Sequence, residues 1–197
     1  TLSGSGGNDT LIGGTGDDTL NGGDGIDSFD GGANSASGDT IDFFGAVGSV
    51  SVDLSTGTIA DDGYGNGETV VNIENVDGSE NIDNITGDSG KNTLDGQGGD
   101  DTLTGAAGND TLIGGDGDDL FVFNDGDGDD SIEDFTVGAG SEDMIDLGGV
   151  SALNNFAAVQ AATTQVGADA VIDTGAGDSI TLLNVNAFNL SQDDFLF

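Results

Sequence analysis

A nine-residue unit, repeated in tandem, constrains this chain more than any other feature of its sequence. Residues 13–30 read GGTGDDTLN and then GGDGIDSFD, and variants of this phrase recur in two blocks. Repetition at a fixed period is typical of proteins that stack similar structural units, each contacting only its neighbours. The sequence therefore predicts a solenoid rather than a globular domain with one central core.

Each position of the unit has its own chemical character. Positions 1, 2 and 4 are mostly glycine, which permits the left-handed backbone of a tight turn, and position 6 is mostly aspartate. Position 8 is a large apolar residue between polar flanks, which predicts a short strand at positions 7–9 with its middle side chain inward. The position-8 residues are Leu11, Leu20, Phe29, Ile85, Leu94, Leu103, Leu112 and Phe121.

A turn followed by a short strand forms half of a flattened coil, so two units close one coil of 18 residues. Coils that stack at the strand spacing of about 4.8 Å bring position 6 of one unit next to position 6 of the unit two further on. The predicted fold is all-β: a right-handed parallel β-roll, or β-solenoid, with a small C-terminal cap. The predicted neighbours are Asp9 with Asp27, Asp83 with Asp101, Asp101 with Asp119, and Asn92 with Asp110.

The segments outside the repeats divide the chain. Alternating stretches at 50–54 and 69–73 predict irregular β coils, with a surface loop at 61–67. In the cap, apolar spacing predicts a short helix near 152–162, and two apolar runs predict a β-hairpin over 170–185. We therefore expect a first repeat block (1–42), irregular β coils (43–77), a second repeat block (78–133) and a C-terminal cap with a secretion-signal region (134–197).

The charge of the chain is extreme and one-sided. It has 38 acidic residues, mostly Asp, against Lys91 alone, and its formal net charge is −37. Two carboxylates one strand spacing apart repel by about 1 kcal/mol in water, and by roughly 3–4 kcal/mol at an effective dielectric of about 20. Each unit buries one large side chain, worth about 1.5–3 kcal/mol, against a backbone-ordering cost of roughly 9–18 kcal/mol. The sequence therefore predicts an unaided chain that is largely unfolded and that folds when it binds cations.

The ligands that the chain offers are oxygen atoms. It has no Cys and no His, which excludes thiolate and imidazole metal sites and a Ser-His-Asp triad. Oxygen ligands indicate a hard cation, and a flexible cage of six or more oxygens suits Ca²⁺ better than Mg²⁺. The negative charge disfavours nucleic acid and anionic membrane surfaces as partners, and no apolar run of transmembrane length is present.

The repeats resemble the RTX (repeats-in-toxin) family, whose nonapeptide reads G-G-x-G-x-D-x-U-x, with U a large apolar residue. The resemblance implies a parallel β-roll that binds several Ca²⁺ ions in its turns. It also implies that the ligands are the position-6 side chains and the main-chain carbonyls of the turn glycines. Carried over residue by residue, the metal-site residues are Gly7, Asp9, Gly14, Gly16, Asp18, Gly23, Gly25, Asp27, Asp39, Asp83, Gly90, Asn92, Gly99, Asp101, Gly108, Asp110, Gly115, Gly117, Asp119, Gly126, Gly128 and Asp130.

Three of these turns depart from the family pattern. Asn92 replaces Asp, Asp83 follows a turn without the position-4 glycine, and the fourth unit reaches its aspartate only at Asp39. We expect weaker or altered sites there.

The position-5 acids Asp17, Asp118 and Asp129 are interpreted as solvated charge. The acids Asp53, Asp61, Asp62, Asp173 and Asp178 are interpreted as surface or turn residues, whereas Glu133, Asp134 and Asp143 leave open a last cation site at the cap.

The C-terminal region also has a resemblance. The stretch GDGDDSIEDF at 126–135, IDL at 145–147 and the final DDFLF resemble the end of serralysin-type secreted proteins, where a type I secretion machine reads an uncleaved signal. This implies an extracellular bacterial module that folds on Ca²⁺ outside the cell. We expect a piece of a longer protein, with no catalysis in this chain, although an upstream catalytic domain stays open. The alternative is an adhesive or polysaccharide-binding module attached to an extracellular enzyme.

Overall fold

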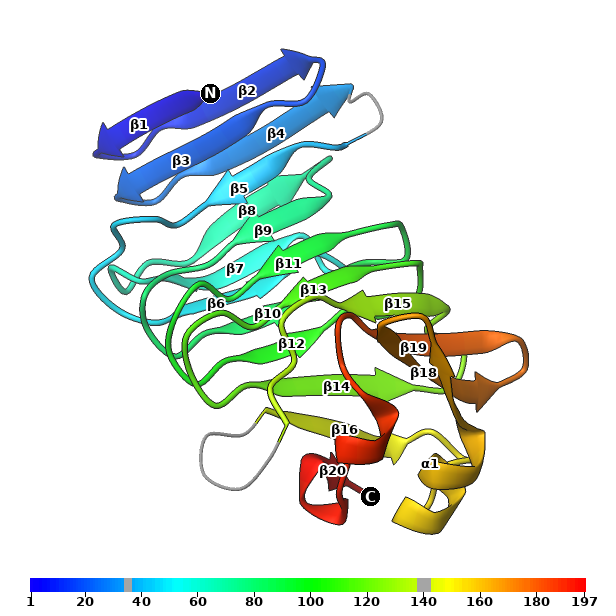
Figure 1. Ribbon diagram of the computed structural model, residues 1–197. Coiled ribbons are helices and arrows are strands. Elements are labelled where there is room, and N and C mark those ends of the chain that lie inside the picture. The colour runs from blue at the N-terminus through cyan, green and yellow to red at the C-terminus, as the bar shows by residue number, and fades with distance from the viewer. Residues whose placement is uncertain (34–36, 138–142) are drawn as a thin grey trace.

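The computed structural model describes residues 1–33, 37–137 and 143–197. The chain winds into a stack of two ten-stranded sheets, with the N-terminus at one end and the C-terminus at the other (Figure 1). The first sheet has, in spatial order, β1 (Leu2–Gly6), β3 (Thr19–Asp24), β5 (Thr40–Asp42), β9 (Asn75–Asp77), β11 (Thr93–Asp95), β13 (Thr111–Ile113), β15 (Asp129–Ile132), β19 (Asp178–Leu182), β18 (Asp169–Gly175) and β17 (Thr163–Val166).

The second sheet faces the first, and the repeat strands alternate between the two sheets along the chain. Its spatial order is β2 (Thr10–Thr15), β4 (Ser28–Ala33), β8 (Glu68–Val71), β7 (Thr58–Asp62), β6 (Val50–Asp53), β10 (Asn84–Thr86), β12 (Thr102–Thr104), β14 (Leu120–Asn124), β16 (Met144–Gly149) and β20 (Phe195–Leu196). The all-β parallel β-roll predicted from the repeats is confirmed.

The repeat strands pair in parallel, and in the regular coils paired residues are 18 positions apart in the sequence, which is the length of two nonapeptides. Leu94 lies opposite Leu112, and Leu103 lies opposite Phe121. Every position-8 residue of the regular units is buried: Leu11 is 4% exposed, Phe29 is 2% exposed, and the others are 0% exposed. The core is therefore a column of one side chain per half coil, as the alternation of positions 7–9 predicts.

The glycines at position 1 have a different role from the one that the sequence suggested. Glycines at positions 2 and 4 do adopt left-handed φ, for example Gly14 at 103° and Gly16 at 105°, but the position-1 glycines are not in that region. Instead, a Cβ on Gly96 would overlap the carboxylate of Asp101 and the main-chain oxygen of Gly114 in the next coil. The contact with the position-6 side chain recurs at the other position-1 glycines, so close approach rather than backbone angle requires glycine there.

The segment 43–77 contributes three strands, β6, β7 and β8, to the second sheet and one strand, β9, to the first. β6 pairs with β7 and β7 pairs with β8 in antiparallel fashion, whereas β8 is parallel to β4 and β6 is parallel to β10. The first sheet passes directly from β5 to β9. The expected strands near 50–54 and 69–73 are present as β6 and β8, and β7 begins earlier than the expected loop, at Thr58.

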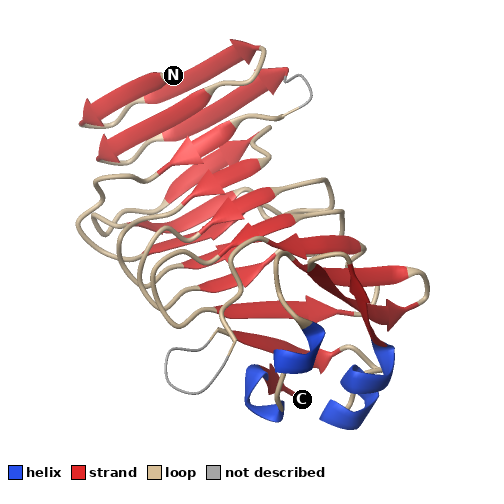
Figure 2. Cartoon of the chain, viewed as in Figure 1, coloured by secondary structure: helices blue, strands red, loops and turns tan. Residues whose placement is uncertain are grey.

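The C-terminal region closes the stack. Helix α1 (Phe156–Ala162) and the antiparallel strands β17, β18 and β19 cover the last coil, and the helical segments lie only at this end (Figure 2). Two short 3₁₀ turns, η1 (Ala187–Asn189) and η2 (Gln192–Asp194), lead to β20, which pairs with β16. No helix in the three described stretches is long and apolar enough to span a membrane.

The position-1 contact gives a direct test. Gly96→Ala should lower the free energy of unfolding by about 1–3 kcal/mol, because the added methyl group meets two oxygen atoms in a packed turn. Gly6→Ala is the control, since its Cβ would meet only the Asp24 carbonyl oxygen at 3.5 Å. Denaturant unfolding of both variants in saturating Ca²⁺ measures the difference. Equal stabilities would show that position 1 does not require glycine for close approach.

Candidate metal centres along the turns

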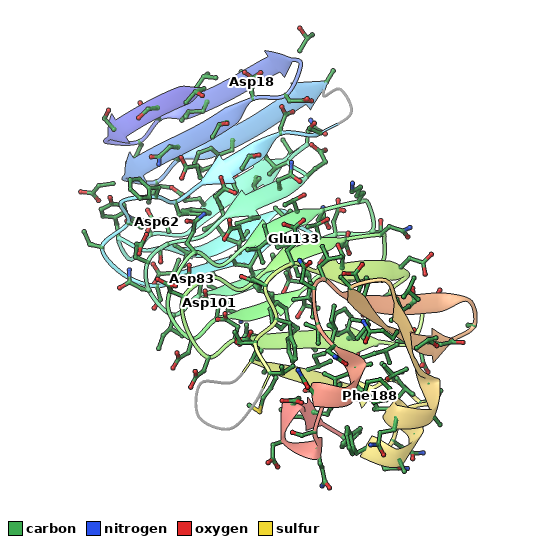
Figure 3. The ribbon with its side chains drawn as sticks, viewed as in Figure 1. Asp18, Asp62, Asp83, Asp101, Glu133 and Phe188 are labelled. Atoms are coloured by element: carbon green, nitrogen blue, oxygen red, sulfur yellow. The ribbon has the colours of Figure 1, made fainter. Side chains whose placement is uncertain are left out.

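The position-6 carboxylates stand in a row along the edge where the second-sheet strands begin. One carboxylate oxygen of each accepts a hydrogen bond from the main-chain N–H of position 6 in the preceding coil. Asp27 Oδ1 accepts from Asp9 at 2.7 Å, Asp101 Oδ1 accepts from Asp83 at 2.7 Å, and Asp119 Oδ1 accepts from Asp101 at 2.9 Å. Figure 3 shows Asp83 and Asp101 next to each other on this edge. The predicted neighbours on this edge are confirmed.

A second row runs along the opposite edge, where the first-sheet strands begin. Asp39 Oδ1 accepts from the N–H of Asp18 at 2.7 Å, and Asp110 Oδ1 accepts from the N–H of Asn92 at 2.8 Å. Asp130 Oδ1 continues the row by accepting from the N–H of Asp110 at 2.8 Å. The hydrogen bond is thus the same on both edges, and the predicted pair of Asn92 with Asp110 is confirmed.

The second oxygen of these carboxylates is what makes the rows candidate metal centres. It is buried and has no hydrogen-bond partner in the described structure at Asp9, Asp27, Asp39, Asp101, Asp110 and Asp119. A buried polar atom without a partner is costly, and a carboxylate oxygen in that position is a natural ligand for a hard cation. The oxygen-only donor set around these turns therefore fits Ca²⁺.

Crowding of like charges perturbs the same carboxylates. Burial, together with the charges of Asp83 and Asp119, raises the pKa of Asp101 to about 7. Burial and the charge of Asp110 raise the pKa of Asp130 to about 7, and the pKa values of Asp110 and Asp119 rise to about 6 for the same kinds of reason. Without a cation, the folded rows hold their ionised form only at a cost.

The turn glycines bring main-chain oxygens to the same edges. The glycine of position 4 in one coil lies against the main-chain oxygen of its counterpart in the coil before, as with Gly25 on Gly7, Gly117 on Gly99 and Gly128 on Gly108. Of the predicted glycine ligands, Gly90 alone lacks a left-handed φ, whereas the others have one: Gly7, Gly14, Gly16, Gly23, Gly25, Gly99, Gly108, Gly115, Gly117, Gly126 and Gly128.

Two of the turns that depart from the repeat are closed by protein donors. Asp83 Oδ2 accepts from the N–H of Ser79 at 2.6 Å, and its Oδ1 accepts from the Ser79 hydroxyl at 2.8 Å. Asn92 Oδ1 accepts from the N–H of Asp88 at 2.8 Å, and its amide donates to the Glu74 carbonyl at 2.7 Å. These side chains have donors where the regular aspartates have none, and their weaker calcium affinity stays a prediction.

The acids near the cap are also engaged. Asp143 continues the second-sheet row, since its Oδ1 accepts from the N–H of Asp119 at 3.1 Å. Its Oδ2 accepts from both the N–H and the hydroxyl of Thr136 at 2.7 Å. Asp134 instead accepts from the N–H groups of Gly114 and Gly115. Asp134 and Asp143 therefore satisfy different parts of the main chain rather than facing a common point.

Sequence reasoning missed two members of the rows. Glu68 Oε1 accepts from the N–H of Asp27 at 3.2 Å, and Glu74 Oε2 accepts from the N–H of Asp39 at 2.9 Å, so each takes the place of a position-6 aspartate. The signal was present as ETVV at 68–71 and ENVD at 74–77, which match positions 6–9 with Glu in place of Asp. Asp62 was interpreted as a surface or turn residue: it is not on the surface, being 2% exposed, but its Oδ1 does close a turn by accepting from the N–H groups of Tyr64 and Asn66.

The number of side-chain ligands at any one point is small. Across residues 1–33, 37–137 and 143–197, no three acidic side chains converge in a group that could hold a metal ion. A Ca²⁺ ion takes six to eight oxygen ligands. An ion at a candidate centre would therefore take one or two ligands from carboxylates, and main-chain oxygens of the turns would supply much of the remainder.

The raised pKa values predict that acid stabilises the metal-free fold. A carboxyl whose folded pKa lies above its unfolded value stabilises the fold below the unfolded pKa and loses that contribution as pH rises through the folded pKa. For Asp101 and Asp130, whose pKa values in the fold are about 7, this stabilising contribution is lost as the pH rises through about 7. In excess chelator, circular dichroism should therefore show more β structure at about pH 5 than at about pH 7.5. Saturating Ca²⁺ should reverse this order, and greater chelated stability at the higher pH would contradict the assignment.

The comparison with protein families agrees with the repeat pattern of these turns. The RTX calcium-binding nonapeptide repeat matches residues 1–35, 77–112 and 95–132, with four copies. Among solved structures, the crystal structure of the extracellular lipase LipA from Serratia marcescens is similar at 22% identity and a TM-score of 0.43, over 97% of this chain and 38% of that one. No curated protein sequence matches the chain. The chain therefore carries RTX calcium-binding nonapeptide repeats, folded as a parallel β-roll.

Proposed function

We propose that this chain is a calcium-dependent folding module of a secreted bacterial protein, with Ca²⁺ bound in the turns by the position-6 side chains and the turn carbonyls. The observation that carries the proposal is the recurrence of one buried, unpartnered carboxylate oxygen in turn after turn. These atoms come from both edges of the roll, so cations would bind along its whole length. The same ions would neutralise the repulsion that opposes folding of a chain of charge −37.

Calcium concentration would then decide whether the roll forms. A ligand that binds only the folded state adds RT ln(1 + [L]/Kd) to stability, which is about 2.7 kcal/mol at one hundred times Kd. Extracellular calcium modules have Kd values of roughly 10⁻⁴–10⁻³ M. Several such sites would be empty at the low free Ca²⁺ of a cytoplasm and filled outside the cell. The module would thus stay unfolded before export and fold after it.

The position of the C-terminal segment supports export before folding. Asp194 is fully buried and Phe195 is 4% exposed, because β20 pairs with β16 at the end of the second sheet. The ring of Phe195 also lies 5.9 Å from that of Phe156 in α1. We infer that a type I secretion machine would read this segment in the unfolded chain, and that folding would then bury Asp194 and Phe195, whereas Leu196 and Phe197 stay 39% and 46% exposed. No observation on the described residues favours the alternative polysaccharide-binding hypothesis.

An isosteric pair of variants within one turn tests the proposal. Asp119→Asn keeps the acceptor for the Asp101 N–H but removes the charge next to the unpartnered oxygen, so the Ca²⁺ midpoint of folding should rise several-fold. Asp116→Asn removes the same charge from an exposed position of that unit and should leave the midpoint close to that of the unaltered chain. Circular dichroism during Ca²⁺ titration from excess chelator measures both. A fully folded spectrum in chelator, unchanged by Ca²⁺, would refute calcium-dependent folding.

A further inference from the structure

The turns of the two repeat blocks adopt two conformations, which differ at position 2 of the unit. In most units this residue has a left-handed φ, even where it is not glycine, as at Gln97 (72°) and Ala106 (66°). Ser79 and Asp88 are the exceptions in the described repeats, since neither has a left-handed φ. We call the left-handed form the open turn and the other form the closed turn. The two closed turns belong to consecutive units, which together make up one coil, residues 78–95, here called the closed coil.

The open turn leaves one oxygen of the position-6 carboxylate without a donor. Every repeat aspartate whose Oδ2 is buried and unpartnered belongs to an open turn. The position-2 and position-6 residues of these turns are Ser5 and Asp9, Gly23 and Asp27, Gly32 and Asp39, Gln97 and Asp101, Ala106 and Asp110, and Gly115 and Asp119. A left-handed φ is also unfavourable for a residue with a Cβ, as at Gln97 and Ala106. The open turn therefore depends on a ligand that uses the unpartnered oxygen.

The closed turn supplies this position-6 atom with a donor from its own main chain. The N–H of Ser79 donates to Asp83 Oδ2 at 2.6 Å. In the next unit, the N–H of Asp88 donates to Asn92 Oδ1 at 2.8 Å. Asp83 is 2% exposed and Asn92 is 0% exposed, yet neither has a buried polar atom without a partner. Both turns are therefore complete without a cation.

The position-2 side chain supports the closed turn. Ser79 Oγ accepts from the N–H of Asn81 at 3.1 Å, and Asp88 Oδ1 accepts from the N–H of Gly90 at 2.6 Å. Serine and aspartate readily bond in this way to the main chain two residues on, and glycine cannot. Ser5 nevertheless lies in an open turn, whose position 4 is a left-handed glycine, so a serine alone does not close a turn.

The closed coil packs against segment 43–77. Asp83 Oδ1 accepts from the N–H of Val50 at 2.7 Å, and the Asn92 amide donates to the Glu74 carbonyl at 2.7 Å. Strand β10 of the closed coil pairs with β6, and β11 pairs with β9, in the middle of the stack (Figure 1). The two position-6 side chains that need no ion thus fasten the closed coil to its neighbour.

Segment 43–77 has a denser apolar core than the repeats. A regular nonapeptide buries one large apolar side chain, whereas this segment buries Phe43, Val50, Val52, Leu54, Ile59, Val70, Ile73 and Val76. Its one buried carboxylate oxygen without a partner is Glu68 Oε2, and Glu68 lies next to Asp27 of the first block. Because apolar burial is the main driving force of folding, this segment and the closed coil depend less on ions than the blocks on either side.

We propose that the closed coil and segment 43–77 fold without Ca²⁺ and form a seed, from which Ca²⁺-driven folding spreads into both repeat blocks. The inference rests on the proposed function and adds to it the order in which the coils fold. In a solenoid each coil contacts only its neighbours, so folding can begin at one coil and propagate. With a seed already folded, bound ions need to stabilise only the added coils, which lowers the Ca²⁺ concentration at which the roll forms.

Hydrogen–deuterium exchange of the full chain in excess chelator tests the seed directly. We expect slow exchange of the main-chain amides of β6, β9, β10 and β11, and rapid exchange of those of β2, β3, β12 and β13. Saturating Ca²⁺ should slow the exchange of all of them. Rapid exchange everywhere in chelator would overturn the seed and leave Ca²⁺-dependent folding intact. Slow exchange of every coil in chelator would contradict both, since no coil would then fold before the others.

Glycine at position 2 should have opposite effects in the two kinds of turn. Ser79→Gly removes the hydroxyl that supports the closed turn, so the Ca²⁺ midpoint of folding should rise several-fold. Gln97→Gly relieves a left-handed φ in an open turn, so the midpoint should fall. Both variants gain the same freedom in the unfolded chain, so opposite signs report the turn conformation. Equal shifts in the two variants, measured by circular dichroism during Ca²⁺ titration, would overturn the inference.

An isosteric change tests the second closed turn. Asn92→Asp replaces the amide that donates to the Glu74 carbonyl by a carboxylate oxygen, so the β11 amides should exchange rapidly in chelator. Asn109→Asp makes the same change at an exposed position of an open turn and should leave exchange in the seed slow. Unchanged slow exchange of β10 and β11 in both Ser79→Gly and Asn92→Asp would overturn the assignment of the seed to the closed turns.

Discussion

One hydrogen bond organises this structure: the main-chain N–H at position 6 donates to the carboxylate of position 6 in the next coil. It fixes the coil spacing on both edges, because it is made in the same way by Asp101 to Asp119 and by Asn92 to Asp110. It also turns the other carboxylate oxygen into the packed turn, where it lies against the position-1 glycine. Glycine at position 1, aspartate at position 6 and the buried unpartnered oxygen are therefore three consequences of one contact.

The same contact makes folding depend on a bound proton or cation. Each aspartate gains a main-chain donor but stands near the carboxylates of the coils before and after it, and burial weakens the screening between them. At Asp101, in the second repeat block, this burial and repulsion raise the pKa to about 7. A proton or a divalent cation removes this repulsion, and a cation can use the unpartnered oxygen that a proton leaves without an acceptor. Folding is thereby coupled to the pH and to the divalent-cation concentration of the solution.

The sequence predicts those features that depend on one unit and its copies. Leu103 is buried and Asp83 meets Asp101 because the period of nine places them there. Features that depend on tertiary pairing were missed, since β7 and the buried Asp62 arise from antiparallel strands with no counterpart in the repeats. The reason for glycine at position 1 was also missed, because the side chain there is excluded by the position-6 carboxylate folding back within the unit and, at Gly96, by a main-chain oxygen of the next coil.

The insertion shows what a solenoid must conserve when its period is broken. Both position-6 places that segment 43–77 supplies hold Glu rather than Asp, at Glu68 and Glu74, and both still accept the N–H of the preceding coil. Glutamate has one methylene more than aspartate, and its carboxylate reaches the same main-chain donor. At both places the following strand keeps the regular register, with Ser28 opposite Thr69 and Thr40 opposite Asn75, so the glutamate occupies the same place in its row as an aspartate would. The first-sheet row thus runs through the insertion from Asp39 to Glu74, whereas in the second sheet the strands β7 and β6 separate Glu68 from Asp83, which accepts from the N–H of Val50 instead.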